Sequence, residues 1–240
     1  MKLYVGFDDT DNAEAAIGTG KLARHFEALL PENCRVWGVV RQQLLVDPGI
    51  PYTSHNSSAC VVLDIPDQAL VETILERADQ HISRESLPGS DPGLCLAPEG
   101  HPALSGLMVF GKSCTEKIVT QRAAMEAANC VHLSGHGGTN DGIIGAAAAV
   151  GLTASGWSGR FIEFGNLRAH PDQVSVSTLT QNGISVVSLD RDAIIPHPED
   201  TVFTKGWLRP RFWGQKAVLP VVQKGKGQWE ILGGKRGKNN

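Results

Sequence analysis

The fold is decided near the N-terminus by the stretch Leu3-Tyr4-Val5-Gly6-Phe7-Asp8-Asp9-Thr10-Asp11. Its apolar part, residues 3–7, is typical of a buried strand. Three carboxylates, those of Asp8, Asp9 and Asp11, follow at the carboxyl end of that strand. Clustered carboxylates hold Mg2+ through oxygen ligands, commonly together with substrate phosphates. The stretch therefore predicts a metal and phosphate site at the end of a core strand.

A glycine-rich turn follows the acidic stretch and opens a helix. The turn is Gly18-Thr19-Gly20-Lys21, and apolar residues then recur at positions 22, 26, 29 and 30, the spacing of one helix face. Free amides and the dipole at a helix N-terminus attract phosphate. We therefore expect Thr10, Gly18 and Gly20 to help bind a nucleotide. Lys21 is expected to add charge near the phosphates, and a surface lysine is the alternative.

A second glycine-rich loop, Gly135-His136-Gly137-Gly138-Thr139-Asn140-Asp141-Gly142, opens a helix of small residues at 143–152. Asn140 or Asp141 is a plausible N-cap. The small side chains indicate that another element packs very closely on this helix. His136 is either a general base or phosphate contact or a hydrogen-bonded structural histidine. The residues expected to contact nucleotide, with a tight structural turn as the alternative, are Gly137, Gly138, Thr139, Asn140 and Gly142.

Composition excludes several classes of protein. The chain is 41% hydrophobic and 20% charged, as in a soluble globular protein. Its five cysteines are odd in number and include no Cys-x-x-Cys pair, so neither a zinc ribbon nor a disulfide framework is indicated. No run reaches the length of a membrane span, and no apolar signal segment opens the chain. We therefore expect a cytoplasmic protein without a membrane partner.

The pattern of expected secondary structure changes near residue 168. Strands and helices alternate before this point, which favours an α/β core. A smaller β-rich piece follows, and from Lys205 onward it carries nine Lys or Arg residues and one acid, Glu230. We therefore expect an ATP- and Mg2+-binding domain at 1–168 and a small basic domain at 169–240, with a mobile tail from Gly233. The basic end could contact RNA phosphates. Its aromatic residues, Trp207, Phe212, Trp213 and Trp229, would then either interleave with the charges or form core.

A formal P-loop pattern is also present. Gly106, four residues, and Gly111-Lys112-Ser113 match it by spacing. The four intervening residues, 107–110, are apolar and predict a buried strand rather than a loop that wraps phosphate. We therefore expect no P-loop, and we expect Lys112 to precede a helix at 115–128.

Several segments resemble, in the same order, the archaeal agmatinylcytidine synthetase family, which modifies an isoleucine tRNA. The acidic motif at 6–11 and Gly142-Ile143-Ile144-Gly145-Ala146, which is similar to the family's Gly-Leu-Ile-Gly-Ala, are the specific parts. Weaker similarity covers 40–52, 53–58, Asp91-Pro92-Gly93 and the segment around Val218-Leu219.

The resemblance implies a fold and a chemistry. Members use a kinase-like domain with ATP and Mg2+ to phosphorylate a tRNA wobble cytidine, and agmatine then displaces the phosphate. A ferredoxin-like domain follows in the family, and we expect this chain to lack the family's OB-fold and zinc ribbon. By resemblance Asp8, Asp9 and Asp11 hold Mg2+ and phosphates, and Thr19 matches the autophosphorylated threonine. The expected fold class is thus α/β (α+β), with a kinase-like mixed-sheet core and a smaller ferredoxin-like β-rich domain.

Three functions remain open at this stage. The leading hypothesis is an ATP- and Mg2+-dependent phosphotransferase or nucleotide-activating enzyme, with RNA or a small molecule as acceptor. Its expected catalytic residues are Asp8, Asp9, Asp11 and Thr19. The first alternative is a non-catalytic nucleotide- or RNA-binding homologue. The second is a haloacid-dehalogenase-like phosphatase, because Asp9-x-Asp11 follows an apolar strand and an aspartate can act as nucleophile.

Overall fold

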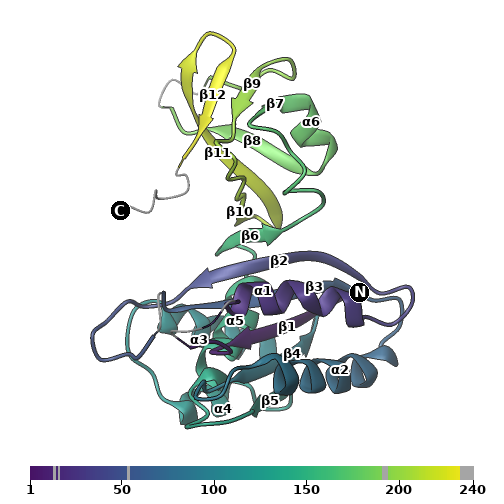
Figure 1. The fold of residues 1–240 in the computed structure, drawn as a ribbon, viewed down its shortest axis with the longest axis vertical. Helices are drawn as coiled ribbons and strands as arrows, with labels where there is room; N and C mark the ends of the chain where they lie inside the picture. Colours follow the sequence, from purple (N-terminus) through teal and green to yellow (C-terminus); the bar gives the residue numbers. More distant parts are fainter. Residues whose placement is uncertain (13–14, 16, 53–54, 191–193, 233–240) are drawn as a thin grey trace. The chain divides into compact units, whose positions relative to one another are not determined.

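The structure is a computed structural model that describes residues 1–12, 15, 17–52, 55–190 and 194–232. The chain divides into two compact units, Met1–Gly159 and Arg160–Asn240 (Figure 1). The division falls ahead of residue 168, where the sequence placed the boundary, because the strand that begins at Arg160 pairs within the second unit. The tail from Gly233, predicted to be mobile, lies outside the described residues.

The first unit is built on an antiparallel sheet with the strand order β5-β4-β1-β3-β2. Its central strand β1 carries the apolar run at 3–7, so the predicted strand is confirmed. The runs at 35–40, 59–63 and 94–96 lie in further strands of this sheet. The strands are β1 (Lys2–Asp8), β2 (Arg35–Gln43), β3 (Ser57–Asp64), β4 (Gly93–Pro98) and β5 (His132–Gly135).

Helices cover both faces of this sheet (Figure 1). On one face Phe7 of β1 contacts the rings of Phe26 and His81, with centroids 5.7 and 6.2 Å away. That face carries α1 (Thr19–His25), its 3-10 continuation η1 (Phe26–Leu29) and α2 (Leu70–Glu85). The other face carries α3 (Ala103–Cys114), α4 (Gln121–Ala127) and α5 (Gly142–Ala154).

The connectivity of the first unit is β1-α1-β2-β3-α2-β4, with β4-β1-β3-β2 side by side in the sheet. This β-α-β-β-α-β order is that of ferredoxin-like folds. The sequence suggested such an arrangement for the smaller domain, and the structure shows this connectivity in the larger unit. The mixed α/β fold class is confirmed.

Strand periodicity places Asp8 on the face that α5 covers. Successive side chains of a strand point to opposite faces, so Asp8 shares its face with Gly6 and opposes Phe7. A Cβ built on Gly6 would overlap the carbonyl oxygen of Ala146 in α5, and one on Gly145 would overlap the Asp8 carboxylate. The prediction that something packs very closely on the small-residue helix is therefore confirmed.

The apolar run at 107–110 is helical, which corrects the predicted strand. It lies inside α3, whose buried residues Leu104, Leu107, Gly111 and Cys114 recur with helical spacing. Four consecutive apolar residues suit either structure, and only their neighbours three and four positions away decide between them. Lys112 accordingly lies in the last turn of α3, so the formal P-loop pattern is part of a helix.

The helix predicted at 115–128 is shorter than expected. Helix α4 begins at Gln121, and Thr120 caps it by accepting a 3.3 Å hydrogen bond from the Ala123 amide. The residues before Thr120 form turns. Among the described residues, no helix is long and apolar enough to span a membrane.

The second unit is β-rich, as predicted. Its strands follow the order β6-β10-β11-β12-β9-β7, and β8 pairs with β11 in parallel. Strands β11 and β12 pair as an antiparallel hairpin. The elements are β6 (Arg160–Glu163), β7 (Gln173–Ser175), α6 (Val176–Gln181), β8 (Ile184–Ser188), β9 (Thr201–Phe203), β10 (Arg211–Trp213), β11 (Lys216–Gly225) and β12 (Gln228–Ile231).

Candidate active site at the carboxyl end of β1

A pocket of about 220 Å3 lies in the first unit beside the loop that follows β1. The four residues predicted as catalytic, Asp8, Asp9, Asp11 and Thr19, all line this pocket. The start of α5 contributes further lining residues, and so does the segment that follows β2. The structure thus brings the first acidic stretch and the beginning of the small-residue helix to one site.

Two more carboxylates, Asp91 and Asp141, line the same pocket. The sequence offered Asp91 only as part of a resemblance, and Asp141 only as a possible helix cap. Antiparallel pairing explains the position of Asp91, since Asp8 at the end of β1 lies opposite Gly93 at the start of β4. Asp141 stands at the N-cap position of α5, although its side chain makes no capping hydrogen bond. Sequence pattern alone did not reveal this pairing of strand ends.

The acidic loop is fixed by the hydroxyl of Thr19. The Thr10 amide donates to Thr19 Oγ1 at 3.3 Å, and Thr10 Oγ1 donates to the same oxygen at 3.1 Å. Thr19 Oγ1 in turn donates to Asp11 Oδ1 at 3.1 Å. Asp9 adopts a positive φ of 48°, which turns the chain sharply after β1. The start of α1 and the acidic loop are therefore held together at the pocket.

The surroundings of Asp8 disfavour the ionised form of its carboxyl. Burial is the main cause that raises the pKa of its carboxyl to about 8, and the carboxylates of Asp9 and Asp11 raise it further. The close approach of Gly145 leaves the carboxylate no room on the α5 side. A cation in the pocket would stabilise the ionised form of such a carboxyl.

The surroundings of Asp9 raise the pKa of its carboxyl as well. Burial, followed by the carboxylates of Asp91 and Asp11, raises the pKa of Asp9 to about 6. Of the described residues that line the pocket, Lys117 is the one lysine or arginine. The pocket therefore carries more negative charge than its own cation can neutralise.

Mg2+ fits this donor set. Among the described residues, no group of three or more His, Cys, Asp or Glu side chains is close enough to form a complete metal site. Mg2+ does not require one, because it commonly takes one or two carboxylates and completes its shell with water and substrate phosphates. The buried, under-compensated carboxylates of Asp8 and Asp9 match that mode of binding.

Part of the pocket lining is apolar. It includes an aromatic ring, that of Tyr52, which is 43% exposed, and aliphatic side chains from two separate loops and from α5. Ligand pockets commonly combine such a wall with a few placed polar groups. The residues of the apolar side are Leu44, Ile50, Pro51, Tyr52, Ile118, Val119 and Ile144.

In the second glycine-rich loop, hydrogen bonds are accepted by a carboxylate of the protein itself, that of Asp91. Asp91 accepts hydrogen bonds from the Thr139 amide at 2.8 Å and from Thr139 Oγ1 at 2.7 Å. A Cβ at Gly138, which has a φ of 56°, would overlap the same carboxylate. Of the residues predicted here to contact nucleotide, Gly142 lines the pocket, whereas Gly137, Gly138, Thr139 and Asn140 do not.

The remaining predicted residues lie around the start of α1. Gly18 precedes the helix, and a Cβ there would come within 3.2 Å of Asp11 Oδ2. Gly20 and Lys21 form the first turn, and the exposed Lys21 does not line the pocket. Thr10 acts through Thr19 rather than on the pocket directly. The structure therefore favours the surface alternative for Lys21.

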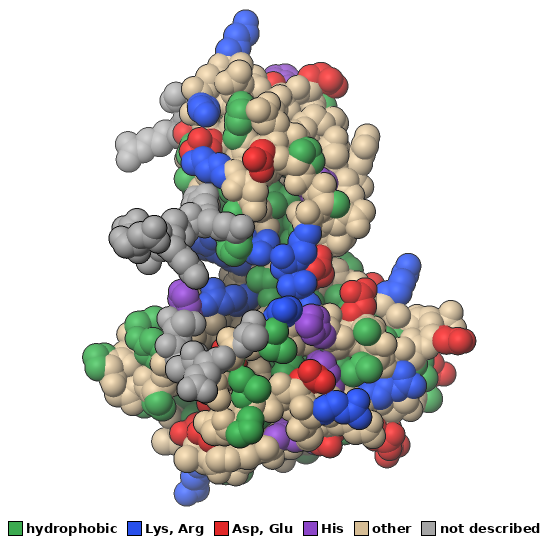
Figure 2. Space-filling view, viewed as in Figure 1, with side chains coloured by type: hydrophobic (Ala, Val, Ile, Leu, Met, Phe, Trp, Pro, Cys, Tyr) green, Lys and Arg blue, Asp and Glu red, His purple; other side chains and the backbone are tan. Residues whose placement is uncertain are grey.

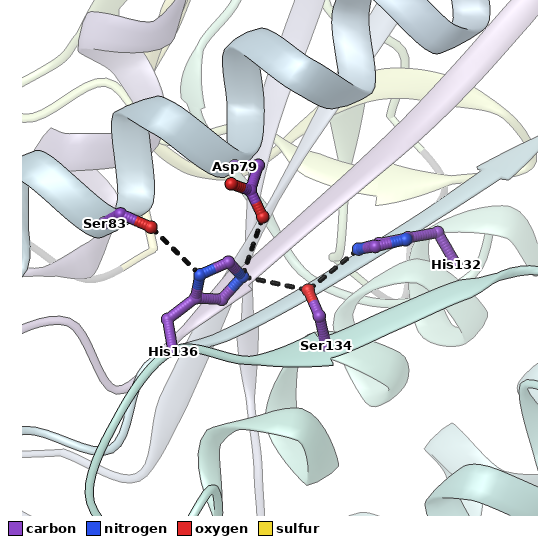
Figure 3. A network of polar contacts seen from close by, with 5 residues as sticks. All are labelled: Asp79, Ser83, His132, Ser134 and His136. Atoms are coloured by element: carbon purple, nitrogen blue, oxygen red, sulfur yellow. Dashed lines mark hydrogen bonds and ion pairs between the residues drawn. The ribbon is translucent and has the colours of Figure 1, made fainter.

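His136 belongs to a hydrogen-bonded network outside the pocket (Figure 3). Its Nε2 lies 2.9 Å from Ser134 Oγ, which is 2.8 Å from His132 Nε2, and its Nδ1 lies 3.1 Å from Ser83 Oγ. Asp79 Oδ1 is 3.7 Å from His136 Nε2. Burial is the main cause that lowers the pKa of both histidines. The contacts support the structural interpretation of His136.

A larger groove of about 480 Å3 lies between η1 and α2. It is lined by His25, Arg77, Arg84 and neighbouring residues, and none of the predicted site residues reaches it. The smaller pocket is the better candidate for chemistry because it gathers buried ionisable groups with perturbed pKa values.

The raised pKa values predict how stability depends on pH in the absence of metal. The folded protein keeps protons on Asp8 and Asp9 that the unfolded chain releases near pH 4. The stability that these two groups contribute is therefore fully present below about pH 4 and is lost as pH rises through 6 and 8. We expect the free energy of unfolding to fall by about 3 kcal/mol between about pH 6 and pH 8 in urea titrations with EDTA. Asp8→Asn should remove most of this fall, and an equal fall in the variant would contradict the assignment.

No protein-family model and no curated protein sequence matches the chain. Solved structures do match. A structure of TiaS, a tRNA agmatidine synthetase, in complex with tRNA and ATP superposes with a TM-score of 0.54 at 23% identity. The apo form of TiaS gives 0.52 at 22%. This chain has a TiaS-like fold.

The TiaS match concerns part of each molecule. It covers 63% of this chain and 36% of the TiaS chain in the ATP complex. A structure of a tRNA fluorescent labeling enzyme matches to the same extent, with a TM-score of 0.53 at 23% identity. The chain thus spans about a third of the length of these structures, and the likeness to TiaS is one of fold.

Proposed function

We propose that this pocket binds ATP together with Mg2+, and that the protein is an ATP-dependent phosphotransferase or nucleotide-activating enzyme. The observation that carries the proposal is the composition of one pocket. Five carboxylates and a set of aromatic and aliphatic side chains line the same pocket. A nucleoside suits the apolar side chains, and metal-bound phosphates suit the carboxylates.

The residues divide into distinct roles under this proposal. Asp8, Asp9 and Asp11 together hold Mg2+. When bound, Mg2+ neutralises phosphate oxygens and so favours phosphoryl transfer. Asp8 is suited to its role because burial and neighbouring carboxylates leave it short of positive charge. The three aspartates thus position the phosphates rather than react with them.

Thr19 is placed to contact a phosphate. Its hydroxyl lines the pocket and donates to Asp11 Oδ1, so a hydroxyl and a carboxylate lie within hydrogen-bond distance at the same edge. The resemblance of this position to an autophosphorylated threonine adds support. Gly18 allows Asp11 to approach the start of α1 closely, with the site of a Cβ 3.2 Å from Asp11 Oδ2.

The proposed acceptor is RNA, with a small molecule as the other possibility. Support comes from the fold, since TiaS structures of similar fold contain tRNA with ATP, or tRNA with AMPCPP and agmatine. A tRNA-related, nucleotide-activating role in tRNA processing is therefore the function that we propose for this chain.

Turnover distinguishes the enzyme from a binding homologue. Purified protein is incubated with Mg2+ and ATP carrying a labelled γ-phosphate, alone, with total tRNA, or with a panel of small amines. We expect label to leave ATP in at least one arm, and Asp8→Asn and Asp11→Asn to abolish this release. Nucleotide binding without turnover in any arm would instead support the non-catalytic alternative. The structure adds no observation in favour of the phosphatase alternative.

A further inference from the structure

In the second unit, the side chains of residues 207–213 alternate between buried and partly exposed. Along residues 207–213, Leu208, Pro210 and Phe212 are buried, whereas the residues between them are partly exposed. The outward row therefore reads Trp207, Arg209, Arg211 and Trp213. Arg211 and Trp213 share one face of β10, and Trp207, Arg209 and Arg211 line one depression.

Each arginine of the row stacks on its neighbouring tryptophan. Arg209 Cζ lies 4.0 Å from the centroid of the Trp207 ring, and Arg211 Cζ lies 5.6 Å from that of Trp213. The other two aromatic residues that the sequence analysis singled out, Phe212 and Trp229, are buried core. The aromatic residues of the basic end thus divide into core and a surface row with arginine partners.

A third arginine adds like charge to the row. Arg160 of β6 is the register partner of Arg211 of β10. Like charges directly opposite one another on paired strands are destabilising. Arg160, Arg209 and Arg211 line one depression with Trp207; Lys and Arg side chains are blue in Figure 2.

Two carboxylates of the second unit, those of Glu163 and Glu230, pair with cations outside the row. Glu230 pairs with Lys205 at 2.5 Å, and Glu163 pairs with Arg168 at 3.3 Å. Arg211 makes no ion pair with any carboxylate in the part of the chain that the structure describes. The positive charge of Arg211 is therefore available to an anionic partner.

We infer that this row binds single-stranded nucleic acid. Arginines neutralise successive phosphates, and unpaired bases stack on aromatic rings and on guanidinium planes, so alternating Trp and Arg suits an unpaired strand. The bases of a duplex are already paired and stacked, so they are not free to stack on the tryptophans. The inference is independent of the ATP pocket, because every residue that carries it belongs to the second unit.

Fluorescence anisotropy of labelled oligonucleotides tests the inference on the full chain. The probes are oligouridylate and oligothymidylate of about ten nucleotides and an RNA duplex of the same length. We expect both single strands to bind more tightly than the duplex. Log affinity should fall with log salt at a slope of about −2, as three phosphate contacts imply for a single strand. Tighter binding of RNA than of DNA would identify RNA as the partner, and equal binding would leave the shared chemistry as proposed.

Variants assign the binding to the row. Arg209→Gln combined with Arg211→Gln should weaken binding at least about tenfold and flatten the salt slope to about −0.7. Trp207→Leu should cost about tenfold, and Trp207→Phe should keep most of the affinity because an aromatic plane remains. Lys226→Gln is the matched control, since Lys226 lies in the turn after β11, far along the strand from the residue opposite Arg211.

Three outcomes would overturn the inference. The first is a double arginine variant that binds as tightly as Lys226→Gln, while circular dichroism shows both folded. The second is duplex RNA bound as tightly as single strands. The third is a wild-type protein that binds no single strand at low salt. ATP binding measured on the same variants reports separately on the first unit, so failure here does not involve the proposed ATP site.

Discussion

Replacing Gly145 by alanine is expected to weaken binding of ATP with Mg2+ on the order of a hundredfold while the first unit stays folded. A Cβ at this position would overlap Asp8 Oδ2, so the Asp8 carboxylate must turn away from its place in the pocket. The side chain can rotate, whereas the backbone of α5 cannot retreat without disturbing its contact with Gly6. The added methyl group therefore acts on the site rather than on the fold.

Isothermal titration calorimetry with ATP and Mg2+ measures this effect. Gly106→Ala is the matched control, because it adds the same methyl group in a helix and its nearest neighbour, the Ala127 carbonyl oxygen, is 3.4 Å from the new Cβ. We expect the control to bind like the wild type. Equal affinities of Gly145→Ala and Gly106→Ala would show that the position of Asp8 does not matter to binding.

Replacing Gly151 by alanine is expected to destabilise the first unit by about 3 kcal/mol. A Cβ on Gly151 of α5 would overlap the backbone carbonyl of Leu107 in α3. Both groups are fixed in helices, so relief requires that α3 and α5 move apart. The separation would open the core cluster that includes Leu107, Ala148 and Leu152.

Thermal unfolding followed by circular dichroism measures the loss. A decrease of about 3 kcal/mol corresponds to a fall in Tm of roughly 6–12 °C for a domain of this size. The same control, Gly106→Ala, should leave Tm nearly unchanged. If Gly151→Ala and Gly106→Ala melt at the same temperature, the close crossing of α3 and α5 is wrong.

The packing of α5 was predictable from the sequence because its residues are small throughout most of 142–154. Such composition favours close approach, and the structure confirms this where Gly6 meets Ala146. The strand at 107–110 was predicted wrongly because its four apolar residues show no period of their own. The decisive positions, Leu104 and Cys114, lie outside that run.

The candidate site was predictable where its residues are adjacent in sequence. Asp8, Asp9 and Asp11 stand together after one strand, and Thr19 follows closely. Asp91 enters the pocket only through the antiparallel pairing of β4 with β1, which sequence pattern does not reveal.

Composition also suggested a phosphate cradle in the second glycine-rich loop. The structure shows that Asp91 already accepts the hydrogen bonds of Thr139 there. A glycine-rich sequence indicates an unusual backbone conformation. It does not indicate whether a ligand or a side chain of the same protein accepts the loop's hydrogen bonds.

Calorimetric titration of ATP into the wild-type protein, with Mg2+ and again with EDTA, tests the central claim most directly. We predict saturable binding at one site with Mg2+, binding about tenfold weaker or more with EDTA, and binding to Asp8→Asn in Mg2+ that is no tighter than wild-type binding in EDTA. Asp8→Asn preserves the shape of the side chain and removes the charge that, with burial, defines the site. Absence of binding to the wild type, or equal affinity of the wild type and Asp8→Asn, would contradict the account.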